Sequence, residues 1–334
     1  MAHNAFIKND LEFCISLPKI ECHAHLSGSI PLQTLKELHE DALRRNPELE
    51  LKKFFDLFNN HIYKVIDTPE ALTVATKSVL DYFEGDNCFY LELRTTPREF
   101  NKGNGIEAYI DALYRAFEAK TYQTMKVSLI LSVNWDSSFI NVRNLVDMAL
   151  GLRDRNPPVV GIDVCGNPLR SELYQLIAPE LKRAKSEGLK LTIHFAEVKT
   201  SKELLENQLR SLNPDRLGHA THSKEVEELI IDRNLPIECC FTSNLKSNTV
   251  ESLEKHHFNW AIEKGLPVLI STDDTLFFGS NLSEEYNLAL RLLGGDRKRL
   301  ISVLEKGIDH IFGSELDKIK LKESLKTFKL HQGL

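Results

Sequence analysis

The strongest constraint on the fold is an alternation of short apolar runs, rich in β-branched residues, with longer helical segments. Eight such runs lie at residues 20–24, 88–94, 127–133, 158–164, 189–196, 215–220, 235–241 and 266–272. Between them, apolar residues recur at about 3.6-residue spacing, and glycine or proline marks several helix-to-strand joins. This pattern predicts an α/β fold, a parallel (β/α)₈ TIM barrel, in which each helix leads to the next strand.

The length of the chain predicts an insertion in this barrel. The sequence has 334 residues, whereas a barrel of this kind typically needs about 250. Most of the excess lies at residues 31–87, which we expect to form helices over the barrel mouth. No repeat or linker divides the sequence, so we predict one domain over residues 1–334. A doubly wound sheet is the alternative, but no GxGxxG turn follows any strand candidate.

Composition and charge indicate a soluble protein. The net charge of −6, from 42 basic and 48 acidic residues, argues against general binding to nucleic acid polymers or membranes. No run is long and apolar enough to span a bilayer, and the first residues lack a signal-peptide pattern. The six cysteines show no CxxC pair or disulfide framework, which favours a reducing, cytoplasmic location.

Polar residues gather at the carboxyl ends of the predicted strands, where barrels of this class carry their active sites. The first run ends in His23 and His25, and their spacing places both imidazoles on one face of a strand. The other strand ends supply Thr95, Thr96, Arg98, Cys165, Gly166, Asn167, His194, Glu197, His219, Asp273 and Asp274. Taken singly, each is compatible with a core histidine, a turn or a helix cap. Their joint placement favours one polar cavity.

Three histidines and one carboxylate at these ends form an N₃O ligand set. The set is His23, His25, His194 and Asp273. It suits one zinc ion, with water completing an open site. Glu197 lies three residues past His194, where it can reach the cavity without being a ligand, and is a candidate for acid–base catalysis. We expect His256 and His257, in a helical or loop segment, to be structural.

The motifs HAHLSGS, GIDVCGN, HFAE, LGHA, CFTSNLKS and STDD occur in the order found in adenosine deaminases. The chain resembles this family from about residue 17 to at least residue 310. The stretches LELRTTPR and ECCFTSNLKSNTVESLEKHHF are more similar to its adenosine deaminase-like branch, which hydrolyses N6-methyl-AMP to IMP and methylamine. The resemblance implies a zinc-dependent barrel hydrolase whose partner is a small purine nucleotide.

The resemblance also implies roles for individual residues. The four residues of the N₃O set match the zinc ligands. Glu197 matches the acid that protonates purine N1, and His219 matches the residue that orients and deprotonates the zinc-bound water. Asp274 would bond purine N7, and the backbone N–H of Gly166 would bond N3.

The substrate's 5′ end is the point at which the sequence leaves alternatives open. Ser27 stands where nucleoside-specific members carry an aspartate, which would repel a phosphate, although the methyl-AMP branch usually has asparagine there. Further predicted substrate contacts are His25, His61, Thr95, Thr96, Pro97, Arg98 and Asn134. Thr95, Thr96 and Arg98 are a candidate phosphate cradle, or a capped strand end with a solvated arginine. Adenosine or deoxyadenosine deamination and a catalytically silent binding protein are the alternative functions.

Overall fold

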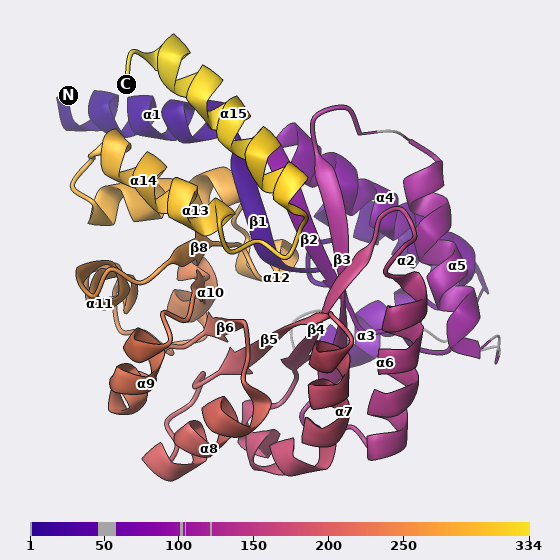
Figure 1. Cartoon of the computed structure of the whole chain (residues 1–334). Helices are drawn as coiled ribbons and strands as arrows, with labels where there is room; N and C mark the ends of the chain where they lie inside the picture. Colours follow the sequence, from indigo (N-terminus) through magenta and orange to yellow (C-terminus); the bar gives the residue numbers. More distant parts are fainter. Residues whose placement is uncertain (1, 46–57, 101–102, 104, 121) are drawn as a thin grey trace.

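The computed structural model describes residues 2–45, 58–100, 103, 105–120 and 122–334 (Figure 1). The side chains of residues 2–8, 42–45 and 58–61 lie outside this description.

Eight parallel strands follow one another around a barrel in chain order, which confirms the predicted (β/α)₈ fold. They are β1 (Lys19–His25), β2 (Cys88–Thr95), β3 (Lys126–Asn134), β4 (Val159–Cys165), β5 (Lys190–Phe195), β6 (Arg216–His219), β7 (Ile237–Cys239) and β8 (Val268–Ile270). The segment after β8 joins β1, because the N–H of His25 donates to Asp273 O at 3.1 Å and the N–H of Asp273 to His23 O at 2.8 Å. These two bonds place Asp273 beside the two histidines.

The observed strands β7 and β8 are shorter than the apolar runs that predict them. Beyond Cys239, the chain turns at once into a helix that begins at Phe241. Apolar residues continue into this helix because it also packs against the core, so hydrophobicity alone does not mark the end of the strand.

Helices surround the barrel. They are α1 (Ala2–Ser16), α2 (Leu32–Arg45), α3 (Phe58–Val65), α4 (Pro69–Gly85), α5 (Gly105–Glu118), α6 (Phe139–Leu152), α7 (Tyr174–Ser186), α8 (Lys202–Leu212), α9 (Glu227–Asp232), α10 (Phe241–Lys246), α11 (Phe258–Glu263), α12 (Thr275–Phe278), α13 (Leu282–Leu292), α14 (Arg297–Ile308) and α15 (Glu315–Gln332). Short 3₁₀ helices cover Pro168–Leu173, Lys224–Val226 and Leu253–Lys255.

Side-chain caps fix where several of the helices begin. The Thr68 hydroxyl accepts from the N–H of Ala71 at the start of α4, where proline occupies the first helical position. Ser138 and Ser201 cap α6 and α8 in the same way. Such caps satisfy N–H groups that have no partner within the helix, and each typically contributes about 1 kcal/mol.

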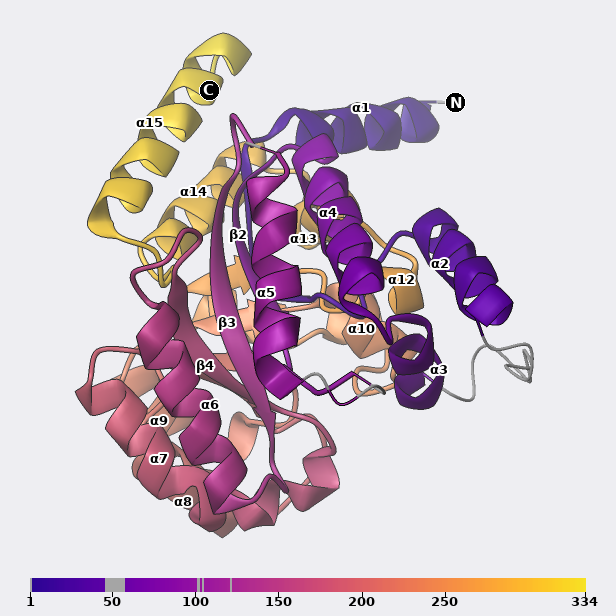
Figure 2. The ribbon, with the colours of Figure 1, turned by 90° about the vertical axis from the view of Figure 1, so that its right-hand side faces the viewer.

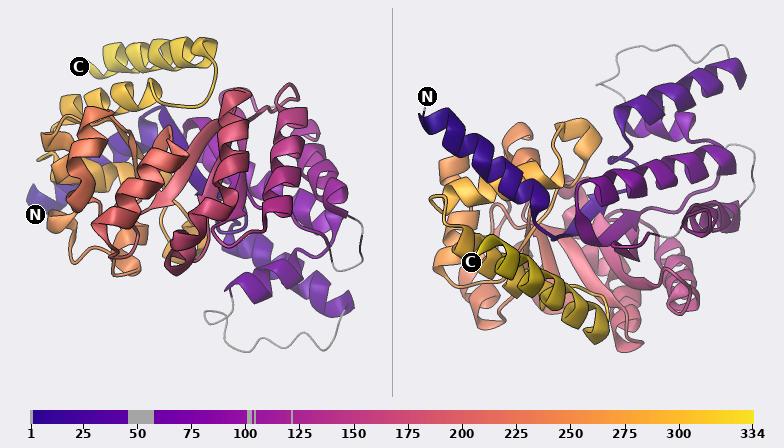
Figure 3. Two further views of the ribbon diagram at one scale, coloured as in Figure 1. Left: turned by 60° about the horizontal axis from the view of Figure 1, so that its bottom comes forward. Right: turned by 90° about the horizontal axis from the view of Figure 1, so that it is seen from above.

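The predicted insertion at residues 31–87 contains helices with two different roles. Helix α4 packs against β2 and α5, as the crossover helix of a barrel does (Figure 2). The additional helices are α2 and α3, which lie at the end of the barrel opposite α1 and α15 (Figure 3). Tyr63 of α3 reaches the wall of the cavity at the carboxyl ends of the strands. Of these two helices, α3 contributes a residue to the cavity wall, and the cover over the barrel mouth stays a prediction.

The helices at the two ends of the sequence pack on the opposite side. The rings of Phe13 in α1 and Phe328 in α15 are 5.5 Å apart.

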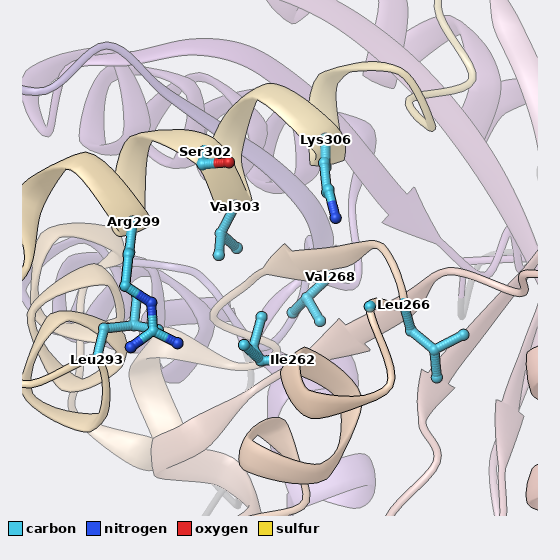
Figure 4. A pocket seen from close by; sticks show the side chains of 9 residues that line it. Ile262, Leu266, Val268, Leu293, Arg299, Ser302, Val303 and Lys306 are labelled. Atoms are coloured by element: carbon cyan, nitrogen blue, oxygen red, sulfur yellow. The ribbon is translucent and has the colours of Figure 1, made fainter.

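A hollow of about 120 Å³ also lies outside the barrel, between α14 and β8 (Figure 4). Aliphatic side chains such as Ile262, Val268 and Val303 line much of it, and none of the predicted site residues does. Over the described residues, no helix combines the length and apolar character that a bilayer crossing requires.

Candidate active site

A cavity of about 790 Å³ opens at the carboxyl ends of the strands. The predicted residues that line it are His25, Ser27, Thr95, Thr96, Arg98, Asn134, Gly166, His194, Glu197, His219, Asp273 and Asp274. His23 lies beneath the cavity floor and is fully buried. Pro97 is not one of the lining residues, and the side chain of His61 falls outside the description.

The four members of the predicted ligand set converge on one point. All four donor atoms lie within 4.8 Å of one another. His194 Nε2 is 3.2 Å from Nε2 of both His23 and His25. Asp273 Oδ1 lies 3.6 Å from His23 Nε2 and 3.4 Å from His25 Nε2. Donors about 2.1 Å from a tetrahedral zinc ion would be about 3.4 Å apart, so this spacing fits zinc.

Two buried carboxylates determine which imidazole nitrogens face this point. Glu238 Oε2 lies 2.6 Å from His23 Nδ1, and Asp163 Oδ1 lies 3.1 Å from His194 Nδ1. Each carboxylate holds a proton on Nδ1, which leaves an Nε2 lone pair directed at the other histidine. Two lone pairs 3.2 Å apart repel unless a proton or a metal cation lies between them. The residues present therefore fit a metal ion.

The pKa values of the histidines follow from the same surroundings. Burial lowers the pKa of His23 well below its ordinary value, and it lowers the pKa of His25 to about 4 although Asp273 opposes it. Burial also acts to lower the pKa of His194, but the Asp163 carboxylate outweighs it and raises that pKa to about 9. The negative charge of Asp163, which favours a proton on His194, equally favours a metal cation there.

A network of buried charges supports these carboxylates inside the barrel. Arg94 donates to Asp163 Oδ1 at 3.0 Å and also pairs with Glu238. Arg216 donates to Glu238 Oε1 at 2.7 Å and pairs with Glu92. All five side chains are fully buried. Sequence reasoning missed this network, although charged residues at every second position of a buried strand, as in LELR, were a usable signal.

The acid–base candidates lie beside the ligand set. His219 Nε2 is 3.8 Å from both Glu197 Oε2 and Asp273 Oδ2, and burial lowers the pKa of His219 to about 4. The backbone of Ala196, His219 and Asp273 has positive φ, at 50°, 57° and 66°. Such conformations are costly for non-glycine residues and concentrate at functional sites.

Two glycines leave room for polar side chains in the cavity. A Cβ on Gly28 would lie 1.6 Å from Asp274 Oδ1, so only glycine allows this position of the carboxyl group. Gly166 has a φ of 89°, and a Cβ there would lie 2.8 Å from Asn134 Oδ1. Burial and the neighbouring Asp273 raise the pKa of Asp274 well above its ordinary value.

Arg98 is held at the wall of the cavity by the inserted segment. Its guanidinium lies 4.0 Å from the centre of the Tyr63 ring and donates to the Ile66 carbonyl at 3.2 Å. Within the part of the chain that the structure describes, no carboxylate pairs with it. The hydroxyl of Thr95 instead bonds that of Tyr109 at 2.5 Å. Of the predicted cradle, Thr96 and Arg98 therefore have the greater freedom to bind a ligand.

Sequence reasoning also missed several residues that complete the cavity wall. Tyr63, Ser243 and Asn244 all line it. Ser243 Oγ donates to Asp273 Oδ2 at 2.7 Å and so orients the carboxylate of the predicted ligand set. The motif CFTSNLKS contains Ser243 and Asn244. A serine or an asparagine does not by itself indicate a role in an active site, so only the fold identifies these two residues.

Comparison with known proteins decides the family. The family model described as adenosine deaminase matches residues 18–328. The chain belongs to the adenosine deaminase family. This confirms the resemblance seen in the sequence motifs.

Relatives within the adenosine deaminase family match over nearly the full length. An adenosine deaminase-like protein of Drosophila melanogaster is 32% identical, covering 95% of this chain and 98% of the relative. The N6-Methyl-AMP deaminase of Danio rerio is also 32% identical, covering 95% and 97%. The crystal structure of Arabidopsis N6-mAMP deaminase superimposes with a TM-score of 0.87 at 30% identity, covering 95% of this chain and 99% of that one. Arabidopsis ADAL complexed with IMP gives 0.86 at 30% identity, covering 95% and 98%.

Proposed function

We propose that this member of the adenosine deaminase family hydrolyses N6-methyl-AMP to IMP and methylamine. Relatives named for that deaminase activity, at 31 and 32% identity, support the reaction. Structural neighbours bound to IMP or to GMP support a nucleotide as the ligand. The cavity of about 790 Å³ at the carboxyl ends of the strands is large enough to hold one.

The metal that we propose is one zinc ion per chain, held by His23, His25, His194 and Asp273. Three neutral nitrogens and one carboxylate, at the spacing described above, are a donor set typical of zinc. Zinc lowers the pKa of a bound water from 15.7 to about 7, which supplies hydroxide near neutral pH. Glu238 and Asp163 keep the two deepest histidines in the tautomer that binds a cation.

The chain's own residues bind and activate the purine in this proposal. Glu197 donates a proton to N1, which withdraws electrons from C6 and opens it to attack by water. Asp274 and the backbone N–H of Gly166 bond N7 and N3 and fix the ring in the cavity. The proton of the hydroxyl formed at C6 passes to the exocyclic nitrogen, and methylamine then leaves C6 as the carbonyl of IMP forms. His219, 3.8 Å from Glu197, lies on the side from which water attacks.

The observation that favours a 5′-phosphate is the position of Arg98. Its guanidinium is fixed at the wall of the cavity by Tyr63 and the Ile66 carbonyl. Ser27 also lines this cavity, where a carboxylate would repel a phosphate. Planar guanidinium groups bind phosphate through charge-assisted hydrogen bonds. We assign phosphate binding to Arg98, Thr96 and Ser27.

A substrate panel tests this assignment. Adenosine, AMP, N6-methyladenosine and N6-methyl-AMP are compared by the change in purine absorbance, and we expect N6-methyl-AMP to give the highest kcat/KM. Arg98→Ala should lower kcat/KM for the nucleotide by roughly 10- to 150-fold, the effect of losing one charge-assisted bond. It should leave the nucleoside nearly unaffected, and Arg98→Lys should fall between. A wild-type enzyme that prefers adenosine would instead support plain adenosine deamination.

We further propose that residues 1–334 form one domain and that the protein is located in the cytoplasm. The joining of β1 to the segment after β8 supports the single domain. The six cysteines are free and buried, which is the usual state of thiols in a reducing compartment.

A further inference from the structure

A buried histidine behind the cavity is connected to His219 through one amide side chain. His256 is 1% exposed and does not line the cavity. The backbone N–H of Phe258 donates to His256 Nδ1 at 3.1 Å. Burial lowers the pKa of His256 to about 2, so the ring is neutral. With Nδ1 accepting, the single ring proton is on Nε2, and it points to Asn244 Oδ1 at 3.1 Å.

The orientation of the Asn244 amide follows from this bond. Its oxygen accepts from His256, so its nitrogen faces His219 Nδ1 at 3.2 Å. The reverse orientation would place the amide N–H₂ against the His256 N–H, two donors without an acceptor. His219 Nδ1 is therefore an acceptor, and the neutral His219 ring carries its proton on Nε2, the nitrogen nearest Glu197 and Asp273.

The same histidine belongs to a group that resembles a second metal site. Donor atoms of Cys239, His256 and His257 lie within 4.8 Å of one another. Both ring nitrogens of His256 are already engaged, one by a backbone N–H and one by the Asn244 oxygen. A metal ion would have to break one of these bonds, so the group fits a hydrogen-bond relay better than a metal site.

We propose that His256 and Asn244 are positioning residues that hold His219 as the Nε2–H tautomer, so that His219 donates a hydrogen bond into the cavity and does not accept a proton there. The catalytic consequence rests on the function proposed above. The proton of the attacking water then passes to Glu197, whose Oε2 lies 3.8 Å from the same His219 nitrogen, and not to His219, the acceptor that the sequence resemblance implies. Glu197 gives it up to purine N1, so one carboxylate first accepts and then donates the proton.

The tautomer can be measured directly in the resting protein. Full-length protein labelled with ¹⁵N-histidine should show a His219 ring with a protonated Nε2 and an unprotonated Nδ1 in two-bond ¹H–¹⁵N spectra. The signal is identified by its loss in His219→Gln. A proton on Nδ1 in the wild-type protein overturns the proposal. This result does not depend on the substrate, so it separates the relay from the proposed function.

Two matched variants of His256 test the catalytic consequence. His256→Phe keeps an aromatic ring next to Phe241, whose ring centre is 4.6 Å away, but removes the donor to Asn244. We expect mixed His219 tautomers and a kcat lower by about 10²-fold, with KM unchanged. His256→Gln retains an amide donor, so it should recover most of the wild-type kcat and most of the Nε2–H tautomer of His219. Wild-type kcat and the Nε2–H tautomer in His256→Phe contradict the proposal.

Asn244→Asp gives an independent result if His256→Phe fails to fold. Aspartate has only acceptor oxygens, so it should draw a proton onto His219 Nδ1. A His219 ring that stays protonated on Nε2 alone in this variant shows that the relay does not set the tautomer.

Discussion

Glu238 Oε2 lies 2.6 Å from Nδ1 of His23, and neither side chain is exposed. The carboxylate orients the imidazole, and it is itself held by Arg94, by Arg216 and by Thr192, whose hydroxyl donates at 3.0 Å. Metal affinity should therefore depend on a residue that is not a ligand.

Glu238→Gln should weaken zinc binding while leaving every proposed ligand in place. The amide holds the His23 proton less strongly, and loss of such a partner typically costs about 10- to 100-fold in metal affinity. Competition with a chelator on the folded protein measures the change. Thr192→Val removes another hydrogen bond of the same carboxylate and should have a much smaller effect. Equal zinc affinity in wild type and Glu238→Gln would show that the pair is only structural.

His194→Ala should remove both the metal and the activity. His194 Nε2 is 3.2 Å from both other imidazoles of the set, so its removal leaves three of the four clustered donor atoms. Elemental analysis of the purified protein should find one zinc per chain in wild type and almost none in the variant. His331→Ala, on an exposed part of α15, is the control and should keep full zinc and full turnover. Full zinc in His194→Ala would make the ligand assignment wrong.

Glu197→Gln should separate acid–base chemistry from metal binding. The carboxyl group lies 3.8 Å from His219 and outside the four-atom donor cluster. The variant should keep zinc and thermal stability but lose at least about 10²-fold in kcat, the lower range for general acid catalysis. If zinc is lost together with activity, Glu197 is a ligand or a structural carboxylate.

The fold and the clustering of His23, His25, His194 and Asp273 were accessible from the sequence because both depend on short-range patterns combined with the barrel hypothesis. Strand alternation shows that His23 and His25 share a face, and the barrel hypothesis brings distant strand ends together. The partners of these residues were not accessible in the same way. Glu238 meets His23, and Asn244 meets His219, only through strand register and side-chain packing, which no local pattern encodes. For residues 31–87 we predicted helices over the barrel mouth but not the bounds of α2 and α3, because inserted helices do not follow the regular alternation of strand and helix.

Glu285 should make stability depend on pH. It is fully buried in α13, accepts from the Thr242 N–H at 3.2 Å, and burial raises its pKa from 4.5 to about 7. Between these values the folded protein holds a proton that the unfolded chain has released, so stability falls as pH rises, by about 3 kcal/mol in total. Glu285→Gln should match wild type near pH 4, below both pKa values, and be more stable at pH 8 in urea unfolding. The exposed Glu323→Gln should show no such difference. A difference in stability between Glu285→Gln and wild type that is the same at every pH would contradict the raised pKa of Glu285.

Gly28→Ala should impair substrate binding without removing the metal. A Cβ at this position would lie 1.6 Å from Asp274 Oδ1 and 2.8 Å from Asp274 Cβ, so the carboxyl group must move. Asp274 is proposed to donate to purine N7 as the neutral acid, and losing a neutral hydrogen bond costs about 0.5–1.5 kcal/mol, or roughly 2- to 13-fold in kcat/KM. Zinc content should stay at one per chain, because the three atoms nearest the added methyl group all belong to Asp274, which is not in the proposed ligand set.

The matched control for Gly28→Ala is Gly151→Ala in α6. A Cβ at Gly151 meets nothing within 4 Å, and its φ is not positive. The control should therefore raise stability slightly, by about 0.5–1 kcal/mol, as alanine does inside a helix, and leave kcat/KM unchanged. If Gly28→Ala turned over N6-methyl-AMP as fast as Gly151→Ala, the position of Asp274 would not matter for the reaction, and its assignment to purine N7 would be wrong.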